Sequence, residues 1–275
     1  MLTDLVQAIA GEEIQVEGLM GPGTDPHLYK PTARDAASLS QAQAILYNGL
    51  KLEGKMQDLF TQMAKQGQLV VAVAESIPPD QRLHPSEFEG HPDPHVWLDP
   101  QLWALCIEPV LHTLTQIAPQ HEALFTSRAK SLHSEYQKLH TWGLKRIDEL
   151  PENSRVLITS HDAFNYFGKA YAFDVIAVQG ISTVTEAGLA DITRVIDTIK
   201  EKQVRSIFVE TSVSAAAIER ISKDSGAEIG GQLFSDAMGI PGTLETDTQG
   251  TTYDLGTYEG MFRHNVNTIV DALLP

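Results

Sequence analysis

The chain contains a single cysteine, Cys106, in 275 residues. One thiol excludes an intramolecular disulfide and a metal cluster built from several thiolates. Basic residues are also few, since 20 Lys and Arg stand against 36 Asp and Glu, and the formal net charge is −16. Because they form no basic run, we expect neither nucleic acid nor an anionic membrane surface as a partner.

Long apolar stretches are lacking as well, and none reaches the roughly 20 residues of a transmembrane helix. Met1 leads directly into polar residues, so we expect no export signal within the sequence as given. What the chain does have is length, together with a hydrophobic content of 42%, which is enough for two cores. We therefore expect two domains.

Helical and strand-like patterns alternate along the first part of the chain. Apolar residues at helical spacing end at Gly11, and an alternating pattern then predicts a strand over 13–20. Strands that alternate with helices indicate crossover connections and a parallel sheet. The same patterns predict further elements, which are helices over 32–42 and 52–65 and strands over 44–49 and 68–74.

The stretch 91–100, H-P-D-P-H-V-W-L-D-P, concentrates imidazoles and carboxylates where no regular helix can form. Pro92 and Pro94 remove backbone donors and fix φ, which predicts a rigid loop. Asp99 followed by proline is typical of a helix N-cap and first helical residue. His95 is therefore expected just before a helix, on a loop that can present its imidazole.

A long helix is predicted over 119–150, where neither a strand pattern nor an internal proline interrupts the helical repeat. At 1.5 Å per residue it would span roughly 45 Å, enough to join two halves of the molecule. His121, His133 and His140 lie along it, and we interpret them as solvent-facing helix residues.

The alternation of strands and helices then restarts. Strands are predicted over 155–159, 175–178 and 206–210, another ends shortly before Asp236, a loop covers 239–256, and a final helix covers 257–274. His27, His95 and His161 all follow predicted strands, as Asp236 does. Ligands of parallel sheets bind beyond the carboxyl ends of the strands. Three imidazoles and one carboxylate would suit a borderline transition metal there, although each residue alone could be an ordinary turn residue or, for Asp236, a helix cap.

Five motifs resemble, in order, those of the zinc- and manganese-specific solute-binding proteins that serve ABC importers. They are D-P-H-L-Y-K-P-T, H-P-D-P-H-V-W-L-D-P, T-S-H-D-A-F-N-Y-F, F-V-E-T-S-V-S and L-F-S-D-A-M-G. The resemblance implies an α/β fold of two lobes, each with a mostly parallel sheet flanked by helices, joined by one long backbone helix. It places an N-terminal lobe at 1–118, the helix at 119–150 and a C-terminal lobe at 151–275. The metal ligands that it implies are His27, His95, His161 and Asp236.

The same resemblance implies a function. We expect high-affinity capture of Zn²⁺ or Mn²⁺ as the transported ligand and its delivery to the membrane permease of an ABC importer. The protein would be a monomer in the periplasm or on the extracellular face of the cytoplasmic membrane, with or without a lipid anchor. Members regarded as manganese-specific tend to carry Glu where this chain has His161, so zinc is favoured.

Two features depart from the family pattern. Family members begin with a strand before the first helix, whereas this sequence starts inside that helix, so we expect the upstream strand to be missing from it. The segment before His95 is shorter than the His-rich insertion of many zinc members. It holds His84 and His91, which leaves a weak auxiliary metal site open.

Two other functions remain as alternatives. A zinc hydrolase would use Glu210 as general base, but catalytic zinc usually keeps three protein ligands and an open position, and Asp236 would fill it. We expect that the protein is not an enzyme. We interpret Glu210 as accepting a hydrogen bond from a ligand imidazole, or as a cap of the following turn. A metal-independent adhesin would use the same fold.

Overall fold

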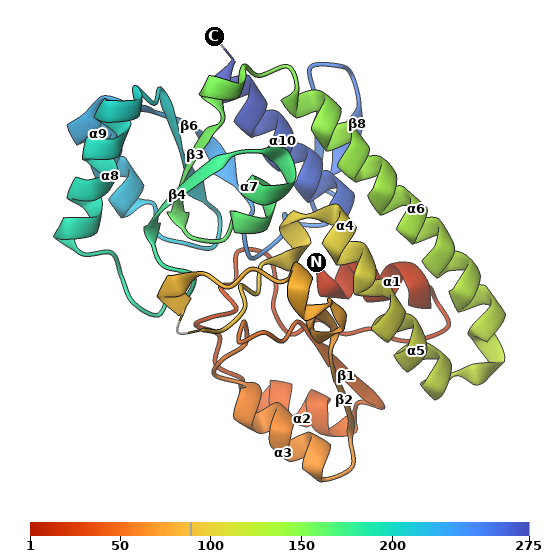
Figure 1. Cartoon of the computed structure of the whole chain (residues 1–275). Coiled ribbons are helices and arrows are strands. Elements are labelled where there is room, and N and C mark those ends of the chain that lie inside the picture. The colour runs from red at the N-terminus through yellow and green to blue at the C-terminus, as the bar shows by residue number, and fades with distance from the viewer. Residues whose placement is uncertain (89, 275) are drawn as a thin grey trace.

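The computed structural model describes residues 1–88 and 90–274, which form a mixed α/β fold (Figure 1). The helices are α1 (Leu2–Ala10), α2 (Ala33–Gln41), α3 (Gln57–Lys65), α4 (Pro100–Leu105), α5 (Ile107–Ile117), α6 (Glu122–Ile147), α7 (Asn165–Tyr171), α8 (Leu189–Lys202), α9 (Ala216–Ser225) and α10 (Tyr258–Leu273). The strands are β1 (Ala44–Tyr47), β2 (Leu69–Ala72), β3 (Val156–His161), β4 (Asp174–Gln179), β5 (Ser206–Glu210), β6 (Glu228–Leu233), β7 (Leu244–Thr246) and β8 (Thr252–Asp254). Every helix in these described ranges is too short or too polar to cross a membrane.

Parallel strand pairs form the centre of both lobes, as predicted. β1 pairs with β2 in the first lobe, while β3 pairs with β4 and β5 pairs with β6 in the second. β3 also lies beside β5, so the two pairs of the second lobe are neighbours. Helices α8 and α9 lie on one side of these strands and α7 and α10 on the other (Figure 1). The carboxyl ends of the strands in each lobe therefore open toward one edge, where ligands bind in such sheets.

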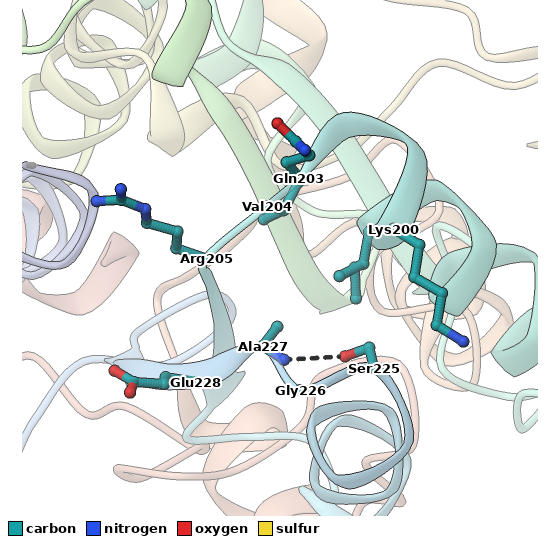
Figure 2. A pocket seen from close by; sticks show the side chains of 9 residues that line it. Lys200, Gln203, Val204, Arg205, Ser225, Gly226, Ala227 and Glu228 are labelled. Carbon is teal, nitrogen blue, oxygen red and sulfur yellow. Dashed lines mark hydrogen bonds between the residues drawn. The ribbon is translucent and has the colours of Figure 1, made fainter.

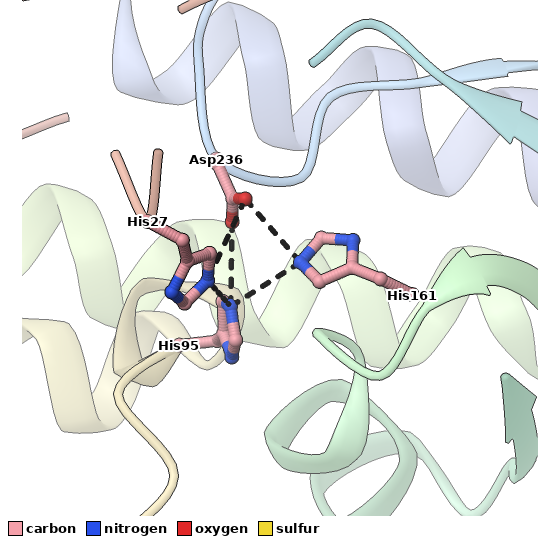
Figure 3. Close-up of side chains that lie close together, drawn as sticks. All are labelled: His27, His95, His161 and Asp236. Carbon is pink, nitrogen blue, oxygen red and sulfur yellow. Dashed lines mark hydrogen bonds and ion pairs between the residues drawn. The ribbon is translucent and has the colours of Figure 1, made fainter. Parts of the chain in front are cut away.

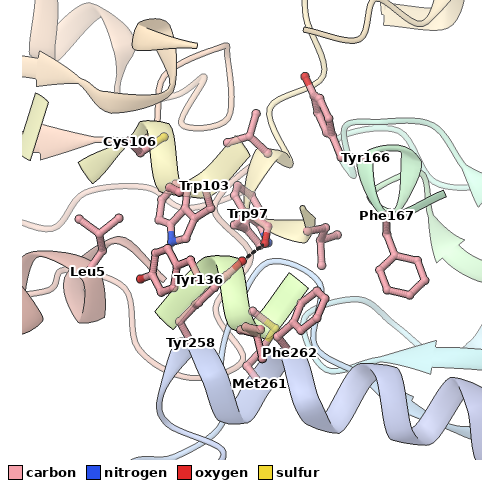
Figure 4. Packing of buried hydrophobic residues seen from close by; sticks show 14 of the residues in the cluster. Leu5, Trp97, Trp103, Cys106, Tyr136, Tyr166, Phe167, Tyr258, Met261 and Phe262 are labelled. Atoms are coloured by element: carbon pink, nitrogen blue, oxygen red, sulfur yellow. Dashed lines mark hydrogen bonds between the residues drawn. The ribbon is translucent and has the colours of Figure 1, made fainter. Parts of the chain in front are cut away.

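Helix α6 runs along one side of the molecule and contacts α1 and α5 near its beginning, α4 around its middle and α10 toward its end (Figure 1). Its 26 residues begin at Glu122 rather than at residue 119, because Pro119–His121 form a 3₁₀ turn. The largest apolar cluster surrounds this helix and draws on both lobes. Within it the rings of Tyr136 and Tyr258 lie 4.7 Å apart, and the Tyr258 hydroxyl donates to the carbonyl oxygen of Trp97 over 2.7 Å (Figure 4). The connecting helix is thus packed into the core of the molecule.

The expected strand over 13–20 is wrong, because this segment is irregular. Its alternating residues Ile14 and Val16 pack partly against the main apolar cluster. The Arg128 guanidinium holds the chain here, since Nη1 donates to the carbonyl oxygen of Ala10 over 3.0 Å and to Glu13 over 2.6 Å. The alternating apolar pattern of this segment therefore reflects burial of one of its sides. It does not reflect pairing with a neighbouring strand among the described residues.

Two further expectations need correction. The predicted loop 239–256 contains an antiparallel hairpin of β7 and β8, whose strands of three residues are too short for a clear alternating pattern. His133 is exposed on α6 as expected, but His140 is buried. Its Nδ1 lies 3.1 Å from the Tyr171 hydroxyl because α7 packs over this turn of α6.

Candidate metal centre

His95 lies in the loop that the proline-rich stretch predicted. The Asp99 carboxylate accepts from the Gln101 backbone N–H over 2.9 Å and caps α4, so the chain is fixed just after the imidazole. Between them Trp97 is buried, and its indole Nε1 donates to the carbonyl oxygen of Ser235 over 2.7 Å. This bond joins the His95 loop to the segment that carries Asp236.

Of the other three, His161 and Asp236 extend from segments at or just beyond strand ends, whereas His27 follows no strand, because the described segment 13–20 is irregular. His27 lies in a turn in which the Asp25 carboxylate accepts from its backbone N–H over 2.8 Å. His161 is the last residue of β3, and Asp236 follows β6 by three residues. The relative exposure of His95 and His161 is 0%, and that of His27 and Asp236 is 3% and 7%. All four are therefore withdrawn from bulk solvent.

The structure brings the four predicted residues together (Figure 3). One potential ligand atom from each lies within 4.8 Å of all the others. The Nε2 atom of His95 is 3.3 Å from that of His27 and 3.4 Å from that of His161. A tetrahedral zinc ion with ligand distances of about 2.0–2.1 Å separates its ligand atoms by roughly 3.3–3.4 Å. The spacing between these imidazoles matches that separation.

Asp236 completes the group from the opposite side. Its Oδ1 is 3.4 Å from His95 Nε2, and its Oδ2 is 3.3 Å from His161 Nε2 and 3.9 Å from His27 Nε2. Among the residues that the structure describes, neither carboxylate oxygen has a hydrogen-bond partner, and both are buried. A buried carboxylate without such partners is costly unless a cation compensates it. The donor set, with a buried carboxylate that faces only the three imidazole nitrogens, fits a divalent cation.

Two further carboxylates orient the imidazoles. Asp93 Oδ1 accepts from the backbone N–H of His95 over 2.9 Å and lies 2.7 Å from Nδ1 of the same residue. Glu210 contacts the same two atoms of His161 with two oxygens, Oε1 at 2.9 Å from the backbone nitrogen and Oε2 at 2.5 Å from Nδ1. A proton on Nδ1 leaves the lone pair of Nε2 directed at the centre of the group. The expected contact of Glu210 with an imidazole is confirmed, whereas the role of Asp93 was missed although it stands two residues before His95.

A sequence model of the family described as ZnuA, zinc-uptake complex component A, periplasmic, matches residues 1–272. The chain belongs to this family. It is 43% identical over 277 residues to the manganese-binding lipoprotein MntA of Bacillus subtilis, covering 99% of this chain and 87% of that protein. It is 41% identical over 278 residues to the zinc-binding protein TroA of Treponema pallidum, covering 99% and 86%.

The fold agrees with this membership. A solved structure of the periplasmic zinc-binding protein TroA from Treponema pallidum matches with a TM-score of 0.93 and 40% identity, over 100% of this chain and 96% of the other. The expected two-lobe α/β fold with a long connecting helix is thereby confirmed.

Electrostatics in this ZnuA-family site favour positive charge at its centre. Burial disfavours the charged form of His95, but Asp93 and Asp236 together outweigh it and raise its pKa to about 9. Burial acts against the charge of His161 too, and attraction to Glu210 and Asp236 raises its pKa well above the usual value. The two imidazoles in turn hold the pKa of Asp236 well below its usual value, against the effect of its burial. The carboxylates that stabilise protons here would equally stabilise a metal cation.

His27 has the opposite character. Burial lowers its pKa to about 3, and the attraction of Asp236 opposes this shift only in part. Its side chain is therefore neutral at physiological pH, which is the form that binds metals.

Within the described ranges 1–88 and 90–274, only the four residues above form a group of three or more potential metal ligands. An auxiliary site at His84 and His91 stays a prediction. A cavity of about 410 Å³, lined among others by Lys200, Arg205 and Glu228, lies at the amino ends of β5 and β6 (Figure 2). It is at the opposite end of these strands from the metal-ligand group.

Proposed function

We propose that this chain captures a divalent transition metal with His27, His95, His161 and Asp236 and delivers it to the permease of an ABC importer. The observation that carries the proposal is the convergence of three imidazole nitrogens on a buried carboxylate that lacks hydrogen-bond partners among the described residues. Membership of the ZnuA family supports the transport role.

Zinc is the proposed preferred metal, with manganese as the alternative. The two relatives do not decide between them, because they are 43% and 41% identical and one is named for manganese and the other for zinc. The donor set does distinguish the two metals. Zinc accepts imidazole nitrogen and four ligands, whereas manganese favours oxygen ligands and binds more weakly at most sites. Three nitrogens and one carboxylate therefore favour zinc.

We also propose how the chain is divided and where it works. The lobes would comprise residues 1–118 and 151–275, with 119–150 as the connecting segment. The main apolar cluster runs through all three parts and therefore marks no boundary between them. The proposed division is based instead on the two groups of strands. The relatives are named as a lipoprotein and as a periplasmic protein, which supports a place on the outer face of the cytoplasmic membrane. The protein would work there as a monomer, and its net charge of −16 supports the absence of a nucleic-acid partner.

The hydrolase alternative finds little support in the placement of Glu210. Both of its oxygens contact His161, one at the backbone nitrogen and one at Nδ1. A general base has to reach the water that it activates, and this carboxylate is already engaged. Transport without catalysis is therefore the proposed function.

The test is metal content followed by a binding titration. The protein would be purified without chelator, analysed by mass spectrometry, stripped, and titrated with zinc and manganese in competition. We expect one ion per chain and tighter binding of zinc. A His133→Ala variant, which changes an exposed histidine of α6, should bind as wild type does. Protein that takes up no stoichiometric metal would refute capture and would favour a metal-independent adhesin.

A further inference from the structure

The carboxylate that orients the His27 turn is itself held by the C-terminal lobe. Asp25 Oδ1 accepts from the backbone N–H of His27, and its Oδ2 accepts from the Thr183 hydroxyl over 2.5 Å. Thr183 lies in the loop that follows β4 and is 6% exposed. One carboxylate thus connects the backbone of a first-lobe ligand to a side chain of the second lobe.

The carboxylate that orients His95 has the same double role. Asp93 Oδ1 contacts the backbone nitrogen and Nδ1 of His95, and its Oδ2 accepts from the Asn165 side-chain amide over 3.0 Å. Asn165 is the first residue of α7, four residues after His161. A second hydrogen bond between the lobes therefore involves a carboxylate, that of Asp93, which orients a proposed metal ligand.

His161 differs, because the residue that orients it belongs to its own lobe. Glu210 ends β5, and β5 lies beside β3, which carries His161. Separation of the lobes would leave that contact in place. It would break the contacts of Thr183 and Asn165 and free the two first-lobe carboxylates to rotate.

We infer that Thr183 and Asn165 are positioning residues that act through Asp25 and Asp93, so that His27 and His95 are aligned only while the lobes are closed. The inference rests on the proposed metal-binding function. Hydrogen bonds to ionised groups are stronger than those between neutral groups. Mutation of the hydrogen-bond partners of metal-binding imidazoles typically lowers metal affinity 10–100-fold. Opening the lobes would therefore weaken two of four ligands and speed release.

The experiment measures the rate of zinc release from the full chain, by stopped-flow mixing with excess chelator. Thr183→Val keeps the shape of the side chain and removes the hydroxyl, and Asn165→Ala removes the amide. Each should raise the release rate by about tenfold. Thr183→Ser restores a hydroxyl and should bring the rate close to that of wild type. The matched control is Thr193→Val on the exposed surface of α8, which should change nothing.

The Tyr166→Phe variant distinguishes two explanations, which are alignment of the ligands and simple contact between the lobes. The Tyr166 hydroxyl donates across the lobes to the carbonyl oxygen of Asp93 over 3.0 Å and leaves the Asp93 carboxylate untouched. We expect a smaller effect on release than that of Asn165→Ala. Melting of the metal-free variants shows that each is folded.

The outcomes distinguish the inference from the proposed function. Wild-type protein that binds no zinc would overturn the proposed function. Zinc-binding wild type together with Thr183→Val and Asn165→Ala variants that release zinc at the wild-type rate would overturn only the inference. So would a Tyr166→Phe variant that releases zinc as fast as Asn165→Ala, since simple contact between the lobes would then explain both.

Discussion

Glu210 contacts His161 twice, with one oxygen 2.9 Å from the backbone nitrogen and the other 2.5 Å from Nδ1. The contact fixes the imidazole at the end of β3 and makes its Nε2 more basic. Because both side chains are fully buried, solvent does not weaken this attraction. At the proposed site this carboxylate would contribute to metal binding without touching the metal.

Replacing Glu210 by Gln should lower zinc affinity about 10–100-fold while the four proposed ligands remain. The reason is the loss of the negative charge that supports the imidazole at Nδ1. Calorimetric or competition titration measures the change, and Glu219→Gln on the exposed surface of α9 is the matched control. Equal affinity of the Glu210 variant and wild type would show that the contact serves folding alone.

The metal should displace protons from the site when it binds. Above pH 3 His27 is already neutral, but the pKa of His95 is about 9 and that of His161 is raised well above its usual value. At pH 7 the His95 imidazole is protonated in the metal-free site and the raised pKa of His161 favours its protonated form, so metal binding has to release protons. Affinity should rise with pH up to about 9 and fall steadily below it.

Titration in buffers of different ionisation enthalpy counts these protons directly. Release of protons at pH 7 agrees with the electrostatics of the site. Binding with no proton release, and affinity that stays constant between pH 6 and 8, would contradict it.

Much of this site could be predicted because parallel strands end at a common edge. His161 ends β3 and Asp236 follows β6, so a reading of the strands alone indicated that they would meet. The orienting partner Asp93 was missed because its bonds depend on a turn of the backbone at His95 and on Asn165, 72 residues away. Sequence spacing carries no signal for such a contact.

The errors in the fold have similar causes. The segment 13–20 alternates because one of its sides packs on the core, and local pattern does not show whether a neighbouring strand is present. His140 belongs to the buried face of α6 because α7, from a distant part of the chain, covers it. A polar residue on a helix reads as exposed until its tertiary neighbours are known.

Metal should stabilise the folded chain, and His95→Ala should abolish most of that effect. An ion that binds only the native state adds about 4 kcal/mol at a thousandfold excess over Kd, which corresponds to roughly 8–16 °C in melting temperature for a chain of this size. Thermal melts with zinc and with chelator measure the shift. His133→Ala should retain the full shift, and a His95→Ala variant that also retains it would remove His95 from the site.

Metal choice should depend on position 161. His161→Glu exchanges a nitrogen ligand for a carboxylate that can bind through two oxygens, and manganese favours oxygen more than zinc does. The substitution also places a second carboxylate near Glu210, and repulsion between the two disfavours ionisation of the new side chain. The affinity gained for manganese should therefore be smaller than the affinity lost for zinc. We therefore expect zinc affinity to fall by orders of magnitude and the zinc-over-manganese ratio to narrow. Competition titration of the variant and wild type at one pH measures this ratio, with His133→Glu as the matched control. A ratio that stays constant or widens would show that His161 does not set the preference and does not bind the metal.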